Sequence, residues 1–70
     1  MLTDRQKQVL RFIGEYIRKH EFSPSQSEIA AAVDSVGPNV CRILDSLEPK
    51  GYVVREYRRH RNITLLKEAA

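Results

Sequence analysis

The sequence predicts a mainly α-helical α+β domain, in which three helices are followed by a C-terminal β-hairpin. Apolar residues recur at helical spacing in three segments before residue 49. After residue 51 the pattern changes to two short runs rich in β-branched and aromatic residues. The chain has 70 residues, the size of one domain with a small core. We expect residues 1–70 to form a single domain.

The first helix is expected to begin near residue 4 and to end near residue 20. Thr3 and Gln6 have the spacing of a capping box, which marks a helix start. The apolar stripe of this helix consists of Val9, Leu10, Ile13, Tyr16 and Ile17. Pro24 favours extended backbone at the residue before it, so residues 21–24 are expected to form a connector. We expect Phe22 to anchor this connector in the core.

A second, shorter helix and a turn follow the connector. Ser25 and Glu28 form another capping box, and this helix is expected to run to about residue 33. Asp34 is among the residues that tolerate the left-handed conformation that such a turn needs. We expect Val36 to fill the core between the helices. Gly37 is expected to be the N-cap of the third helix, with Pro38 as its first helical residue.

The third helix is amphipathic along its whole length and is expected to end near residue 48. Its apolar face consists of Val40, Ile43, Leu44 and Leu47, and its polar face of Asn39, Arg42, Asp45 and Ser46. A polar outer face is found on an ordinary surface helix, and also on a helix that enters the major groove of DNA. Gly51 suits a left-handed position after the helix.

The hairpin is expected to pair strands at about residues 52–57 and 63–66, with a loose tip that lacks glycine. The chain has 12 Lys and Arg against 9 Asp and Glu, a net charge of +3. Residues 55–61 hold four arginines and one glutamate, so this segment alone accounts for +3. Such a concentrated charge suits phosphate groups. The alternative is a solvated charge run without a ligand.

Three helices and a basic hairpin form a winged helix-turn-helix, and the sequence resembles two families of this kind. Residues 2–6 with Val9, Ile13 and Ile17, then 22–25 and 28–30, resemble the N-terminal DNA-binding domain of LexA repressors. Residues 40–48 and 50–53 resemble MarR-type regulators. The resemblance covers about residues 2–66 and implies DNA binding and transcriptional repression.

The sequence also departs from the LexA pattern. LexA proteins have a second, self-cleaving and dimerising domain, for which a chain ending at residue 70 has no room. We therefore expect neither self-cleavage nor an SOS role. The third helix is one residue out of register with that of LexA, so the base-reading residues of the family do not transfer and the operator sequence stays open.

The predicted function is sequence-specific binding of double-stranded DNA, with the third helix in the major groove. Asn39 is expected to contact adenine and Arg42 to contact guanine. The alternatives are that Asn39 only starts the helix and that Arg42 pairs with Asp45 or Ser46. Cys41 is interpreted as a half-buried filler, with a small groove-facing contact as the alternative.

Contacts to the DNA backbone or the minor groove are expected from the start of the second helix, the end of the third helix and the hairpin tip. The residues are Ser25, Ser27, Ser46, Lys50, Arg58, Arg59 and Arg61. Capping of the second helix alone explains Ser25 nearly as well.

Other function classes find less support. A winged-helix protein-docking module, in a transcription, replication or phage-related assembly, is the main alternative, with Phe12 and Tyr57 as surface candidates. No spacing of catalytic or metal-binding residues is present, so we expect no enzyme activity, no metal and no cofactor. No membrane span or small-molecule site is expected, and the location is expected to be cytoplasmic. A homodimer on a two-fold DNA site stays open.

Overall fold

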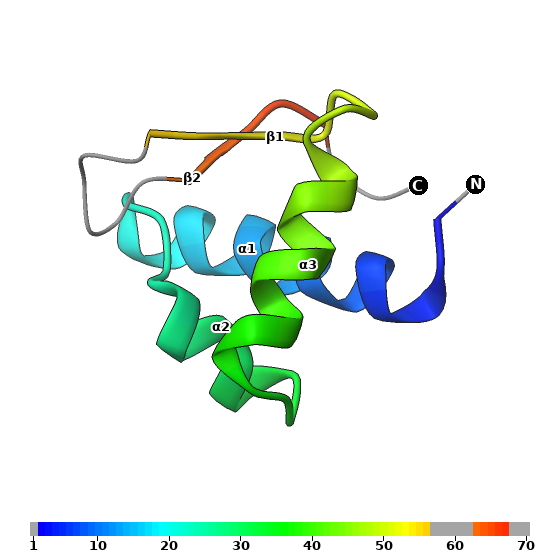
Figure 1. The fold of residues 1–70 in the computed structure, drawn as a ribbon. Coiled ribbons are helices and arrows are strands. Elements are labelled where there is room, and N and C mark those ends of the chain that lie inside the picture. Colours follow the sequence, from blue (N-terminus) through cyan, green and yellow to red (C-terminus); the bar gives the residue numbers. More distant parts are fainter. Residues whose placement is uncertain (1, 57–62, 68–70) are drawn as a thin grey trace.

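Three helices and one antiparallel β-hairpin make up the computed structural model, which describes residues 2–56 and 63–67 (Figure 1). The helices are α1 (Asp4–His20), α2 (Gln26–Ala32) and α3 (Gly37–Leu47), and the strands are β1 (Val53–Arg55) and β2 (Ile63–Leu65). Figure 1 shows α1 crossing behind α3, with α2 on one side and the hairpin on the other. The predicted mainly α-helical α+β fold class is confirmed.

Both predicted capping boxes are present. The Thr3 hydroxyl accepts a hydrogen bond from the Gln6 backbone N–H at 3.1 Å, and the Gln6 side chain accepts one from the Thr3 N–H at 2.8 Å. Ser25 and Glu28 repeat this arrangement at 3.2 Å and 2.8 Å. These reciprocal bonds satisfy N–H groups that a helix start would otherwise leave unpaired. The predicted starts of α1 and α2 are therefore confirmed.

The core lies where the three helices and the inner side of the hairpin meet. Its buried apolar members are Val9, Leu10, Ile13, Ile29, Ala30, Val33, Val40, Leu44, Leu47, Val53 and Ile63. Three of the four predicted apolar residues of α3 are fully buried, and Ile43 packs at the edge of the core. This leaves the polar side of α3 facing outward.

The predicted core position of Phe22 is wrong, since its side chain is 48% exposed. Glu21 has φ 64° and caps the end of α1 in the left-handed conformation. This bend places Ser23 and Pro24 inside the protein. The Phe22 ring instead makes an edge-to-face contact with Tyr16 at the surface, with 5.8 Å between ring centroids.

The predictions for the start of α3 also need correction. Val36 does not fill the core but is 59% exposed, whereas Val33 is buried in the core at 1% exposure. Val36, with extended backbone, is the N-cap, so Gly37 is the first helical residue and Pro38 the second. Asp34, with φ 53°, has the predicted left-handed conformation.

The hairpin is shorter than predicted within the described residues. β1 and β2 pair so that Val53 faces Leu65, Val54 faces Thr64 and Arg55 faces Ile63. Val53 and Arg55 point inward and Val54 outward. The Ile63 backbone N–H also donates a hydrogen bond of 3.3 Å to the Ser23 hydroxyl. The second strand is thereby attached to the connector ahead of α2.

Candidate nucleic-acid interface

The outward face of α3 is the side opposite Val40 and Leu44, and it presents Arg42 and Asp45 to solvent. Arg42 is exposed, and among residues 2–56 and 63–67 its side chain has neither an ion pair nor a hydrogen bond. The alternative pairing of Arg42 with Asp45 or Ser46 is therefore not formed. The guanidinium keeps all its N–H donors available to a ligand.

Asn39 is exposed in the first turn of α3. Its backbone N–H donates to the Val36 carbonyl at 3.1 Å, as expected at a helix start. The exposed amide has both donors and an acceptor, which is the combination that recognises adenine in the major groove. Asn39 and Arg42 are three positions apart, so they lie on neighbouring turns of one helix surface.

Ser46 lies on the flank of α3 that faces α1. Its hydroxyl donates to the Ile43 carbonyl at 2.7 Å and accepts from the Gln6 side-chain amide at 2.6 Å. Ser25 is buried at 6% exposure, and its hydroxyl accepts from the Glu28 N–H. Both hydroxyls are thus already engaged in holding the helices.

The other predicted backbone contacts lie at two places. Ser27 is exposed in the first turn of α2, and Lys50 is exposed after α3. The Cys41 thiol donates to the Gln26 side-chain carbonyl at 3.7 Å, which brings the start of α2 next to the first half of α3. Arg58, Arg59 and Arg61, like Tyr57, lie outside the described residues.

Arg55 is the one arginine of the basic segment 55–61 that the structure describes, and it does not face solvent. Its side chain is 2% exposed and forms ion pairs with Asp45 of α3 and with Glu48, the C-cap of that helix. Its third contact is a 3.8 Å hydrogen bond to the Cys41 sulfur. The prediction that the whole segment offers its charge to phosphates is therefore wrong for Arg55. The burial of Arg55 could have been predicted from the alternation of side chains along a strand, because Val53 and Arg55 lie on the same side of β1.

Arg5 fixes the other end of α2. Its guanidinium, which comes from α1, donates to the Val33 carbonyl at the C-cap of α2. No basic residue occurs in the last turn of α2 itself. A cation at this position interacts favourably with the negative end of the helix dipole. Arg5 therefore helps to hold the turn that leads into α3.

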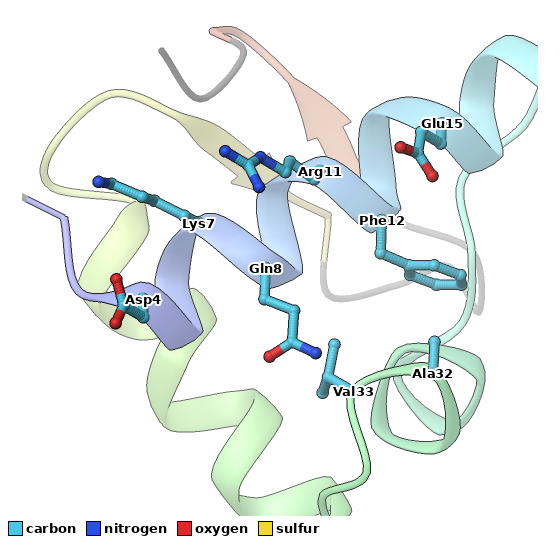
Figure 2. Close-up of a pocket in the computed structure, with 8 residues that line it drawn as sticks. All are labelled: Asp4, Lys7, Gln8, Arg11, Phe12, Glu15, Ala32 and Val33. Carbon is cyan, nitrogen blue, oxygen red and sulfur yellow. The ribbon is translucent and has the colours of Figure 1, made fainter.

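A surface hollow of about 550 Å³ lies between α1 and the end of α2 (Figure 2). Its lining residues are Asp4, Lys7, Gln8, Arg11, Phe12, Glu15, Ala32 and Val33. None of the predicted DNA-contacting residues takes part in it. In the described part of the chain, no group of His, Cys, Asp and Glu is placed to hold a metal ion, and no helix is long and apolar enough to cross a bilayer.

The arrangement of α2, the turn and α3, with a hairpin beside α3, defines a winged helix-turn-helix domain. A solved structure with this architecture, a point mutant of S. aureus MepR from the MarR family, superposes with a TM-score of 0.68 and 29% identity. The match covers 91% of this chain and 47% of that chain. Residues 1–62 match the family described as the LexA DNA binding domain. The chain belongs to this family, as the sequence resemblance predicted.

Two LexA repressors illustrate the relationship. The protein of Thermosipho africanus (strain TCF52B) is 39% identical over 66 residues, which is 94% of this chain and 33% of the relative. The protein of Pseudothermotoga lettingae is 40% identical over 68 residues, which is 97% of this chain and 34% of the relative. The chain thus spans about a third of the length of these repressors.

Proposed function

We propose that this domain binds double-stranded DNA in a sequence-specific manner, as the DNA-reading part of a repressor-type transcription regulator. One observation carries the proposal: the outward face of α3, the second helix of the helix-turn-helix, presents an exposed arginine without a partner in the described residues. In this motif the second helix lies in the major groove. Membership in the LexA DNA-binding domain family supports the same function.

Two side chains of α3 are proposed to read bases. The Arg42 guanidinium can donate two hydrogen bonds to O6 and N7 of guanine, and the Asn39 amide can pair with N6 and N7 of adenine. Both are exposed on the first two turns of the helix, the part that a helix-turn-helix inserts deepest.

Backbone contacts are proposed from Ser27, Lys50, Arg58, Arg59 and Arg61. Phosphate contacts place the protein on the duplex without distinguishing bases. Ser25 and Ser46 are weaker candidates, because their hydroxyls already bind Glu28, Gln6 and Ile43.

In this proposal the chain acts on DNA in the cytoplasm and has no enzymatic activity of its own. Two copies of the domain bind a two-fold DNA site, since one DNA-binding domain of this size contacts only a short stretch of sequence. A monomer on a single half-site would disprove that part of the proposal.

The test uses the 70-residue chain and a duplex selected by it from a random-sequence library, with a scrambled duplex as reference. Arg42→Ala is expected to reduce the preference for the selected duplex by about 1–3 kcal/mol, the value of one bidentate base contact. Fluorescence anisotropy gives both dissociation constants. Arg11→Ala, which removes the same charge from an exposed position of α1, is the control and should keep the preference.

If Arg42→Ala leaves both affinity and preference unchanged, α3 is not the reading helix. The alternative of a protein-docking module would then be favoured, because Phe12, Tyr16, His20 and Phe22 form a chain of ring contacts at the surface. Absence of any duplex binding by the unmodified chain would favour that alternative directly.

A further inference from the structure

Arg42 and Asp45 lie three positions apart on the outward face of α3, a spacing at which opposite charges on a helix normally pair. The structure shows a different pairing. The Asp45 carboxylate, whose side chain is 64% exposed, accepts a hydrogen bond from the Arg55 guanidinium of β1. Asp45 is thus held on the flank of α3 that faces the hairpin, and Arg42 is left without it.

The Arg55 side chain, which holds Asp45, is itself anchored by several contacts. Its Nε donates to Glu48, its Nη1 to Cys41 and its Nη2 to Asp45, so three separate nitrogens bind two side chains of α3 and that of its C-cap. The backbone of Arg55 is fixed by strand pairing opposite Ile63. A buried guanidinium is strongly destabilising when it loses its carboxylate partners. The hairpin therefore controls the position of the Asp45 carboxylate.

We propose that Arg55 is a positioning residue for DNA recognition: by holding Asp45 it keeps the base-reading side chain Arg42 free. This inference rests on the proposed function, in which Arg42 contacts a base. It also gives the hairpin a role in base reading that does not depend on its own contacts to DNA.

Loss of Arg55 has a definite consequence in this arrangement. Asp45 becomes free to pair with Arg42, and a pair of this kind on a helix surface lowers the availability of Arg42 about twofold. Glu48 loses the same partner, but it lies six positions after Arg42 and on a different side of the helix. Of the two carboxylates that Arg55 releases, Asp45 is therefore the one spaced to pair with Arg42, and Glu48 is a matched control.

The experiment compares Arg55→Met alone, Arg55→Met with Asp45→Ala, and Arg55→Met with Glu48→Ala, all in the 70-residue chain. The first readout is the mobility of the Arg42 Nε–H group, measured by ¹⁵N relaxation without DNA. We expect this group to be mobile in the unmodified chain, to become ordered in Arg55→Met, and to regain mobility only with Asp45→Ala.

The second readout is the ratio of dissociation constants for the scrambled and the selected duplex. We expect Arg55→Met to lower this ratio about twofold, Asp45→Ala to restore it, and Glu48→Ala to leave it low. Thermal unfolding of each variant is recorded in parallel, because loss of a buried ion pair also lowers stability. A purely structural role of Arg55 would not be rescued by Asp45→Ala.

Should Arg55→Met not fold, Arg55→Lys replaces it in all three variants. Lysine keeps the charge but cannot bind both carboxylates with one planar fork, so the same changes are expected at smaller size. The inference is overturned if Arg42 stays mobile in the Arg55 variant, or if Asp45→Ala fails to reverse the loss of preference. The proposed function fails separately, if Arg42→Ala itself leaves the preference unchanged.

Discussion

At the scale of single residues, the two serines at the start of α2 show how one residue type serves two purposes. Ser25 is buried and caps the helix through the Glu28 N–H, whereas Ser27 is exposed two positions later. Their hydroxyls have the same chemistry, so burial decides which one supports the fold and which one is available to DNA.

We therefore expect Ser25→Ala to affect stability and Ser27→Ala to affect DNA binding. Ser25→Ala should reduce the free energy of unfolding by about 1 kcal/mol through loss of the cap, which corresponds to roughly 4–8 °C in Tm for a domain of this size. Ser27→Ala should leave Tm within about 2 °C and weaken DNA binding. Differential scanning calorimetry measures both Tm values. Equal Tm values for the two variants would contradict the capping role of Ser25.

Local pairs could be predicted from the sequence, and distant pairs could not. Both capping boxes join residues three positions apart, so spacing alone indicates them. The Gln6 to Ser46 bond spans 40 positions, and the ion pairs of Arg55 connect a strand to a helix. Such contacts depend on how the elements pack. For this reason charge alone groups Arg55 with the rest of the basic segment 55–61, although strand alternation puts it on the same side as Val53.

At the scale of elements, helix spans were easier to predict than the direction of the connectors. The ends of α1 and α2 follow from caps and apolar periodicity. The orientation of Phe22 instead depends on the left-handed backbone of Glu21, a residue type that rarely adopts it. After this left-handed residue Phe22 is exposed, and Ser23 is the neighbour that is buried.

The turn between α3 and β1 gives a prediction for the hairpin. Gly51 has φ 80°, in the left-handed region, so Gly51→Ala should destabilise the protein by about 1–2 kcal/mol. Gly37 begins α3, and a Cβ there meets nothing within 4 Å beyond its two chain neighbours. Because the ring of Pro38 disfavours helical backbone at a preceding residue with a Cβ, Gly37→Ala should be destabilising, but less so than Gly51→Ala. Urea unfolding of both variants measures the difference. A neutral Gly51→Ala would show that the turn can change its conformation.

At the scale of the whole molecule, the distribution of charge matters more than its sum. The net charge is +3, but the charge of Arg55 is neutralised by two carboxylates of α3. The cations proposed for the DNA backbone are then Lys50, Arg58, Arg59 and Arg61. The DNA contacts of Arg58, Arg59 and Arg61 were predicted from the sequence alone and stay a prediction.

This count predicts the salt dependence of binding to a random duplex. About four neutralised phosphates per chain give a slope of log K against log salt of about −4. Replacing Arg59 and Arg61 by alanine should reduce the slope by about 2 and weaken binding to all sequences alike. Titrations at several salt concentrations measure the slope. A slope near zero would exclude contact with the phosphate backbone.

The hydrogen bond from the Ile63 amide to the Ser23 hydroxyl joins the hairpin to the segment that leads into α2. Ser23 lies two residues before the N-cap of that helix, so the proposed docking of the hairpin on a duplex and the entry into α2 would share this junction. The rate at which the Ile63 amide proton exchanges with deuterated solvent therefore reports on the position of the hairpin and on the start of α2 together. A ligand that presses the hairpin against the helices would slow this exchange without touching the residue itself.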